Sequence, residues 1–451
     1  MGDDVIDAVK RNIGDTLSCA LAGSSAKGID IVSDLVRGWG GSAEADVLVL
    51  GGRVPAHHAA WINSAMCHAR DYDDTHDEAM LHAGVSSVPA AIAAAQLRGH
   101  VPGADLIAAV AAGLEVTCRL GRATTVDIVE TGFIYSSLLG YFGATAAAGR
   151  AFRLTQDEMA SAFGIVYSSV AGNHQVTRDA SLMKRLQPGL AAQAAVVAVQ
   201  LARRGIRGPQ GVFEGIDGFF RVYLHGRAST GDVRADLGTR FELMNLSYKP
   251  YPCCRDTHAA VDAVLELRRG AHRLADDIES IRVGLTCPGY QMVCVPEQVR
   301  LAPRTIVEAQ FSIPYAVAAA WIDGGLGLAH FTDEALRRSD VLALASRVQP
   351  FVDDEIDRDW RRVITPAKVS VHFRDGQTVQ ARVDYSKGHP KNPMTRREIA
   401  EKTIDCVAVA ARPVDAETVD RFVTTVSELE SIQDVATLVQ TLVPVSKDTR
   451  C

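Results

Sequence analysis

Alanine-rich apolar segments run through the first 245 residues of the chain. The clearest are AAIAAAQ (90–96), LIAAVAAGLEV (106–116), GATAAAGRAF (143–152) and GLAAQAAVVAVQLARRG (189–205). Alanine has the highest helix propensity, and a helix that is apolar nearly all round is a buried one. Thr155 precedes a glutamine and two acidic residues, which predicts a helix N-cap at that position. The pattern therefore predicts a region made mostly of packed helices.

The pattern changes near residue 248, where YKPYPCC predicts an extended or turning segment. IESIRVGLTC (278–287) alternates and contains β-branched residues, as a strand does. AKVSVHF (367–373) and TVQARVDY (378–385) flank Asp375 and Gly376, a combination that predicts a β-hairpin. Helical segments such as SIPYAVAAAWIDG (312–324) lie between the strands.

Helical character returns after residue 395 and continues to the end of the chain. The fold class that follows is mainly α. We expect a large all-helical domain formed by residues 1–247 plus 396–451. A smaller α+β lid domain, residues 248–395, is expected as an insertion in it. The length of 451 residues also favours two domains.

Composition narrows the class of protein. Hydrophobic residues make up 47% and charged residues 22% of a chain whose net charge is −7, which is typical of a globular protein and gives no basic face for nucleic acid. No stretch of about 18 uncharged apolar residues predicts a membrane span. The nine cysteines are irregularly spaced without a CxxC pair, which favours a reducing compartment and predicts a cytoplasmic protein.

Several common motifs are missing or incomplete. The chain has neither GxGxxG nor a P-loop sequence, which argues against a nucleotide cofactor. The segment DYDDTHDEAMLH (71–82) has acidic residues and a threonine at the spacing of a calcium loop. However, its sixth position is His76 instead of glycine and its twelfth is His82 instead of glutamate. We therefore expect no metal site, and a solvated acidic loop is the plainer interpretation.

Four separate segments concentrate polar residues beside apolar ones. They contribute Asp71, Thr75 and His82; Lys184 and Arg185; Lys249, Arg255 and His258; and Tyr290. Each has a structural alternative: Lys184 as a cation at a helix end, His258 as a core histidine, and Tyr290 as an aromatic residue at a strand end.

Together, these segments resemble one protein family in sequence and in order. HARDYDDT, KRLQPGLAAQAAVVAVQLARRGI and KPYPCCRDTH are similar to three characteristic stretches of the MmgE/PrpD proteins. EAQFSIPYAVAAAWIDG (308–324) and GHPKNPMTRREIAEK (388–402) match two more, so the resemblance covers about the whole chain. The family includes 2-methylcitrate dehydratase, cis-aconitate decarboxylase and iminodisuccinate epimerase.

The resemblance implies a homodimer with a large helical domain and a smaller lid, acting on a small polycarboxylic acid without metal or organic cofactor. It implies Asp71, Thr75, Lys184 and Lys249 as site residues, together with His82 and Tyr290. We expect His82 to be the acid–base residue, with Asp71 orienting it and Lys184 stabilising negative charge. The expected catalytic set is His82, Asp71, Lys184, Tyr135 and Tyr290. The expected substrate-binding set is Thr75, Arg185, Lys249, Arg255 and His258.

The sequence departs from the family pattern at two expected histidines. Ile134 stands at one of them, followed by Tyr135, and Cys254 stands at the other. Either Tyr135 substitutes or the substrate differs. We expect dehydratase chemistry, a carbon–oxygen lyase reaction on a small hydroxy-polycarboxylate. The alternatives are a decarboxylase or epimerase on the same scaffold, or a polycarboxylate-binding protein that has lost its catalysis.

Overall fold

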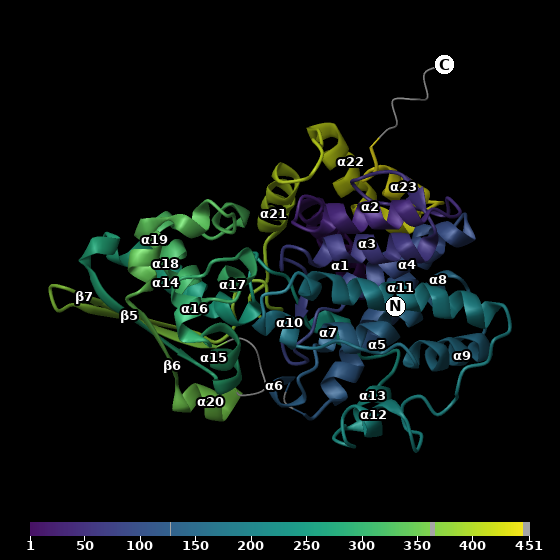
Figure 1. Ribbon diagram of the computed structural model, residues 1–451, viewed down its shortest axis with the longest axis horizontal. Coiled ribbons are helices and arrows are strands. Elements are labelled where there is room, and N and C mark those ends of the chain that lie inside the picture. The colour runs from purple at the N-terminus through teal and green to yellow at the C-terminus, as the bar shows by residue number, and fades with distance from the viewer. Residues whose placement is uncertain (127, 361–365, 445–451) are drawn as a thin grey trace. The chain divides into compact units, whose positions relative to one another are not determined.

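The computed structural model describes residues 1–126, 128–360 and 366–444. The chain divides into two compact units, each treated by itself here. The first consists of residues 1–176, 182–246 and 401–451, and the second of residues 177–181 and 247–400. Helices predominate in the first unit, whereas the second combines helices with a four-stranded sheet (Figure 1). The predicted mainly α fold class is therefore confirmed.

The first unit is built from helices of one to six turns. They are α1 (Asp3–Gly23), α2 (Ile29–Trp39), α3 (Ala56–His68), α4 (Gly84–Arg98), α5 (Gly103–Ala123), α6 (Ile128–Thr131), α7 (Tyr135–Leu138), α8 (Gly140–Ala151), α9 (Gln156–Tyr167), α11 (Met183–Arg203), α12 (Phe219–Val222), α13 (Thr230–Arg234), η1 (Glu242–Asn245), α22 (Ala416–Ser427), η6 (Leu429–Ser431) and α23 (Ala436–Gln440). Two further helices, α10 (Gln175–Arg178) and α21 (Arg396–Ala408), cross from one unit to the other along the chain.

The alanine-rich helices form the core of this unit. Helix α3 packs against α1, α4 and α11, and α8 packs against α4, α5 and α11. Small side chains let the backbones approach closely: a Cβ on Gly143 of α8 would lie 2.8 Å from the carbonyl oxygen of Gly113 on α5. At α9, the Thr155 hydroxyl accepts a hydrogen bond from the Glu158 amide and the Glu158 carboxylate accepts one from the Thr155 amide, which confirms the predicted N-cap.

The expectation that this unit is all-helical is wrong in one detail. Strands β1 (Ala45–Asp46) and β2 (Arg53–Val54) form a short antiparallel pair. The loop between them closes through a hydrogen bond from the Val47 amide to Gly52, and both Gly51 and Gly52 have positive φ. Two more short strands are β3 (Thr75–His76) and β4 (Leu246–Ser247).

The second unit alternates short helices with the strands of its sheet. Its elements are η2 (Arg255–Thr257), α14 (His258–Ala271), η3 (Ala275–Asp277), β5 (Ile278–Leu285), α15 (Cys287–Val293), α16 (Glu297–Leu301), α17 (Ile306–Gln310), α18 (Ile313–Asp323), η4 (Leu328–His330), η5 (Ala335–Arg337), α19 (Ser339–Ala345), β6 (Val348–Val352), α20 (Asp354–Trp360), β7 (Ala367–Phe373) and β8 (Thr378–Val383).

The sheet has the order β6-β5-β7-β8. Strands β5 and β6 are parallel, whereas β7 is antiparallel to both β5 and β8. The predicted hairpin is confirmed as β7 and β8, with Gly376 at a φ of +86° in the turn. Strand β7 alternates buried and half-buried residues, and α14 packs on the hairpin while α18 packs on β6. In the core of this unit, the ring of Trp321 on α18 packs against that of Phe373 on β7.

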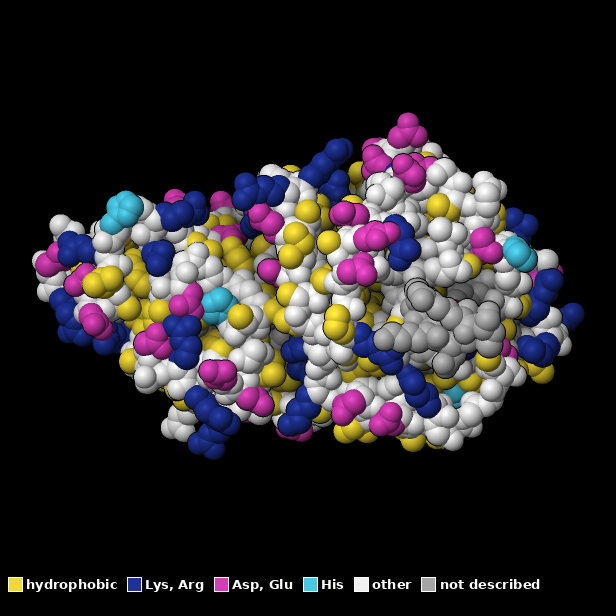
Figure 2. All heavy atoms as spheres, turned by 90° about the horizontal axis from the view of Figure 1, so that it is seen from above, with side chains coloured by type: hydrophobic (Ala, Val, Ile, Leu, Met, Phe, Trp, Pro, Cys, Tyr) yellow, Lys and Arg dark blue, Asp and Glu magenta, His cyan; other side chains and the backbone are white. Residues whose placement is uncertain are grey.

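The surface carries both charges. Lysine and arginine side chains are interspersed with acidic ones on the face shown in Figure 2. Within the described ranges, every helix is too short or too polar to traverse a lipid bilayer.

Candidate active site

The site segment is the connection between α3 and α4, residues 69–83. It folds back on itself because two non-glycine residues, Asp71 and Met80, adopt the left-handed conformation, each with a φ of 53°. The His76 amide closes the fold with a hydrogen bond of 2.8 Å to the carbonyl of Leu81. The segment is buried along most of its length. The interpretation as a solvated acidic loop is therefore wrong.

Asp74 fixes the end of this segment at the start of α4. Its carboxylate accepts hydrogen bonds from the backbone amides of Ala83 and Gly84, both at 3.0 Å. These are amides of the first turn, which no carbonyl within the helix can satisfy. Burial, followed by the charge of neighbouring Asp73, raises the pKa of Asp74 to about 6.

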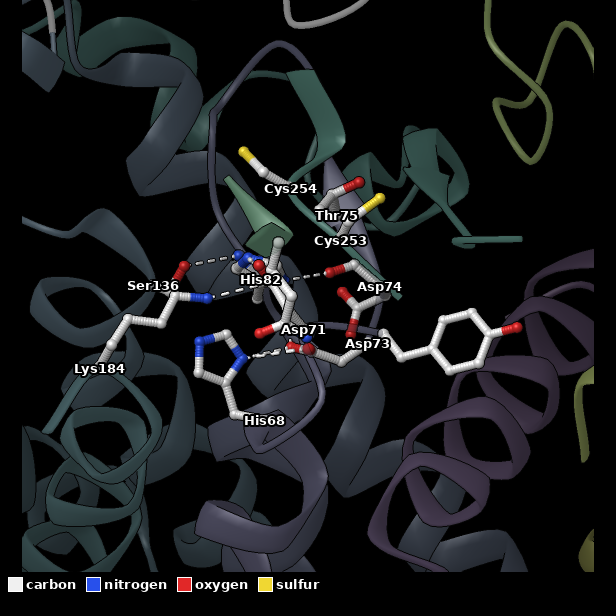
Figure 3. Close-up of polar contacts among 12 residues, drawn as sticks. His68, Asp71, Asp73, Asp74, Thr75, His82, Ser136, Lys184, Cys253 and Cys254 are labelled. Atoms are coloured by element: carbon white, nitrogen blue, oxygen red, sulfur yellow. Dashed lines mark hydrogen bonds and ion pairs between the residues drawn. The ribbon is translucent and has the colours of Figure 1, made fainter. Parts of the chain in front are cut away.

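Both ring nitrogens of His82 have identifiable neighbours in the site (Figure 3). Its Nδ1 lies 2.7 Å from the carbonyl oxygen of Asp74 and 3.0 Å from Oδ2 of Asp73. Its backbone amide donates to Oγ of Ser136, on α7, at 2.9 Å. Its Nε2 points the other way and lies 4.0 Å from Oδ1 of Asp71. With Nδ1 directed at two oxygen acceptors, Nε2 is the nitrogen available for proton transfer.

Asp73 is shared between His82 and a second histidine. His68, the last residue of α3, places its Nδ1 2.9 Å from Oδ2 of Asp73. Burial lowers the pKa of His68 to about 4, so its ring is neutral at pH 7. Although burial alone would raise it, the pKa of the Asp73 carboxyl is held well below its usual range by His68 and His82. Asp73 is therefore a carboxylate that accepts a hydrogen bond from His68 and forms an ion-pair contact with His82.

Lys184 supplies a positive charge beside the same cluster. Its Nζ lies 3.0 Å from Oδ1 of Asp71, and both side chains are less than a tenth exposed. Lys184 and Arg185 both lie in the first turn of α11, which begins at Met183.

Arg185 is buried beside Lys184 and donates to the carbonyl of Lys27 at 3.3 Å. Burial, followed by the nearby charge of Arg70, lowers the pKa of Arg185 to about 10, so its guanidinium remains charged at pH 7. A buried cation of this kind can bind a carboxylate with two parallel hydrogen bonds.

Two other expected residues of the first unit already have internal partners. Thr75 donates its hydroxyl hydrogen to Asp77 at 3.0 Å. Tyr135, at the start of α7, donates to the carbonyl of Val126 at 3.1 Å. Ile134, which stands where the family has a histidine, is 7% exposed and precedes α7.

The remaining expected residues belong to the second unit. Lys249 is fully buried, and Arg255 donates to the carbonyl of Lys387 at 2.9 Å. His258 begins α14, where its Nε2 lies 3.2 Å from the carbonyl of Cys253. Tyr290 lies on α15 and is half-buried, and burial raises the pKa of its hydroxyl.

Sequence reasoning missed three residues of this cluster. We expected Asp71 to orient His82, whereas the carboxylate within hydrogen-bond distance of its Nδ1 belongs to Asp73. His68 and Ser136 were not predicted as site residues. The spacing of His68 and Asp73, five residues apart across the end of a helix, is the sequence feature that could have indicated their contact.

The side chains of His68, Asp73 and His82 also invite a metal interpretation, since one ligating atom from each lies within 4.8 Å of the others. The geometry argues against it. A ring nitrogen 2.7 Å from a carbonyl oxygen, as Nδ1 of His82 is from Asp74, must carry a hydrogen. It then has no lone pair for a metal. The arrangement is that of a hydrogen-bonded acid–base cluster.

The site combines a histidine held beside carboxylates with buried cations. This arrangement is suited to proton transfer on anionic molecules. Comparison of the sequence with known protein families identifies the family to which the chain belongs. Residues 1–231 match the MmgE/PrpD N-terminal domain, and residues 251–428 match the MmgE/PrpD C-terminal domain. The chain belongs to the MmgE/PrpD family, as the sequence resemblance indicated.

Individual relatives cover nearly the whole chain. A cis-aconitate decarboxylase of Aspergillus terreus (strain NIH 2624 / FGSC A1156) is 27% identical over 458 residues, 97% of this chain and 92% of that protein. A cis-aconitate decarboxylase-like protein of Aspergillus oryzae is 28% identical over 96% of this chain and 92% of its own. The human cis-aconitate decarboxylase is 27% identical over 97% of this chain and 90% of its own.

Proposed function

We propose that the chain is a lyase that moves a proton at a carbon next to a carboxylate of a small polycarboxylic acid. The observation that carries this proposal is His82, whose Nδ1 is held by Asp73 and Asp74 while its Nε2 faces away from both. A histidine held in this way is suited to exchange a proton near neutral pH. Family membership supports a lyase-type role.

The cations provide the electrostatic part of the mechanism. Removing or adding a proton beside a carboxylate passes through an enolate-like state, in which negative charge moves onto the carboxylate oxygens. Lys184 and Arg185 are the proposed partners of that charge, because both are buried and cationic. Lys184 would exchange its contact with Asp71 for the substrate carboxylate.

Decarboxylation is the first of the candidate reactions, because the relatives that match the chain are named as cis-aconitate decarboxylases. In that reaction the bond between carbon and a carboxylate breaks, carbon dioxide leaves, and the electron pair stays on carbon. His82 in its imidazolium form would deliver the proton that this carbon takes up.

Dehydration of a hydroxy-polycarboxylate is the second candidate. Neutral His82 would remove a proton beside the carboxylate, and a tyrosine would protonate the leaving hydroxyl. Tyr290 suits that step better than Tyr135, whose hydroxyl donates to Val126 in this structure. Ile134 and Cys254, which replace expected histidines, favour a substrate that differs from those of the named relatives.

The substrate-binding residues that we propose from the family match are Thr75, Arg185, Lys249, Arg255 and His258.

Epimerisation, or binding without catalysis, remains the alternative. The test is incubation with a panel of di- and tricarboxylates carrying ¹³C-labelled carboxyl groups, cis-aconitate among them, with and without EDTA. Labelled carbon dioxide identifies a decarboxylase and a new olefin a dehydratase. Thermal stabilisation without any product would contradict the lyase proposal.

A homodimer is the assembly that we propose, supported by an apolar surface on the first unit. Trp39, Val197 and Leu201 are 52%, 37% and 38% exposed and line a groove of about 820 Å³. Light scattering after gel filtration should give twice the chain mass. Leu201→Asp should shift it toward the monomer, whereas Leu274→Asp, at a 75% exposed leucine of the second unit, should not. A wild-type monomer would refute this assembly.

The cysteines within the described ranges are unbonded. Together with their irregular spacing, this supports a reducing compartment, and we place the protein in the cytoplasm. Cell fractionation would test the location.

A further inference from the structure

The carboxylate of Asp73 lies between two imidazole rings in the first unit. Nδ1 of His68 is 2.9 Å from its Oδ2, and Nδ1 of His82 is 3.0 Å from the same oxygen. The two rings meet edge to face, with centroids 4.8 Å apart. His68 and Asp73 are almost completely buried, whereas the side chain of His82 is 15% exposed.

The chemistry of these groups fixes their hydrogens. An ionised carboxylate can only accept hydrogen bonds, so His68 donates its Nδ1–H to Asp73. The Nδ1–H of His82 is directed at the carbonyl of Asp74, 2.7 Å away, and lies beside Oδ2 of Asp73, 3.0 Å away. A neutral imidazole with a hydrogen on Nδ1 has its lone pair on Nε2. His68 therefore holds Asp73 as an oriented acceptor, and Asp73, together with the carbonyl of Asp74, selects one tautomer of His82.

We propose that His68 is a positioning residue for the reaction: by anchoring the Asp73 carboxylate, it keeps His82 in the tautomer whose Nε2 accepts and returns the substrate proton. This inference rests on the proposed function, because it assigns to His82 the acid–base step. His68 touches no reacting atom in this account and acts through Asp73 alone.

The surrounding charges determine the direction of the effect of removing His68. In the first unit, His82 faces the carboxylates of Asp71 and Asp73, the backbone carbonyl of Asp74, the ring of His68 on α3, and the ammonium of Lys184 on α11, and the Asp74 carboxyl interacts with its charge. A carboxylate that loses one donor interacts more strongly with its remaining partner. Without His68, Asp73 should stabilise the charged form of His82 more and raise its pKa.

Nitrogen NMR of protein carrying ¹⁵N-labelled imidazole rings measures this directly. His82→Gln assigns the His82 signals. In the wild type we expect Nδ1 of neutral His82 to carry the hydrogen and Nε2 to be unprotonated. In His68→Leu we expect the pKa of His82 to rise above its wild-type value, because Asp73 then has one fewer donor to share its charge with.

Two further variants make the measurement specific. Asparagine can present a side-chain N–H where His68 presents Nδ1–H, so His68→Asn should keep the wild-type tautomer and pKa of His82. His76→Leu removes another buried histidine of the same segment, whose Nδ1 accepts from the Ala79 amide and which does not contact Asp73. It should leave the His82 signals unchanged.

Three results would overturn the inference. The first is a wild-type His82 with its hydrogen on Nε2, which requires no variant beyond the His82→Gln protein used for assignment. The second is a His68→Leu protein whose His82 titrates as in the wild type. The third is a wild-type spectrum that changes on addition of EDTA, because a metal would then occupy the Nδ1 atoms. None of these measures turnover. Failure of the lyase proposal would appear separately, as a His82→Gln enzyme with unchanged activity.

Discussion

Replacing Lys402 with methionine should destabilise the first unit far more than the loss of an ordinary lysine. Lys402, on α21, places its Nζ 2.6 Å from Oδ1 of Asp15 on α1 and 2.7 Å from the carbonyl oxygen of Tyr72 in the site segment. The ammonium also lies 4.3 Å from the centre of the Tyr72 ring. Burial alone would lower the pKa of Lys402, but Asp15 raises it well above the ordinary value, so the lysine stays charged.

The magnitude follows from burial. The side chains of Lys402 and Asp15 are 2% and 3% exposed, so removing the lysine leaves a carboxylate in the interior without its cation. Breaking a buried pair in this way costs about 3–5 kcal/mol. Replacing both residues by apolar ones, in Lys402→Met with Asp15→Leu, should recover most of that loss because no unpaired charge remains.

Urea denaturation of the single and double variants measures these differences. Lys10→Met is the matched control: Lys10, on α1 itself, is also paired with carboxylates, but its partners Asp7 and Glu430 are 67% and 46% exposed. Its loss should cost less than about 1 kcal/mol. The reasoning is refuted if Lys402→Met costs no more than Lys10→Met, or if the double variant is less stable than Lys402→Met.

Further outcomes follow from the site segment. Gly84→Ala should lower turnover and stability, because its Cβ would lie 2.6 Å from Oδ1 of Asp74, whose carbonyl holds His82; a thermal scan with a turnover assay tests it, and an unchanged variant would contradict it. For His68, burial moves the pKa from 6.5 in the unfolded chain to about 4 in the folded one. The unfolded chain therefore binds the extra proton, so His68 stabilises the fold above pH 6.5, and this contribution is lost as the pH falls toward 4. The wild type should lose up to about 1.4 kcal/mol more per pH unit than His68→Asn across that window, as measured by urea denaturation at several pH values. Equal slopes would show that His68 is not buried in its neutral form.

The sequence was most informative where local chemistry determines the backbone. Thr155 was predicted as an N-cap and is one, since a hydroxyl followed three residues later by a glutamate satisfies the first amides of a helix. The hairpin of β7 and β8 was predicted from Asp375 and Gly376, because only a residue tolerant of positive φ suits that turn.

The site segment shows where such reasoning ends. Four carboxylates lie between residues 71 and 77, and their spacing alone did not show which of them meets His82. That choice depends on the positive φ of Asp71 and Met80, which folds the segment back and brings Asp73 to the ring. Neither residue is a glycine, so no local signal marks the reversal. The family resemblance identified the segment, and within it we predicted the orienting role for Asp71 instead of Asp73.

The central claim, a lyase that moves the substrate proton through His82, is tested most directly by deuterium exchange. Wild type and His82→Gln are incubated with cis-aconitate and related di- and tricarboxylates in deuterated water, with EDTA present, and proton NMR follows label entering next to a carboxylate. We predict exchange or conversion by the wild type and a loss of about 10²–10⁴-fold in His82→Gln, the contribution of a general acid–base residue. Equal rates in the two proteins, or no exchange by the wild type with any compound, would contradict the account.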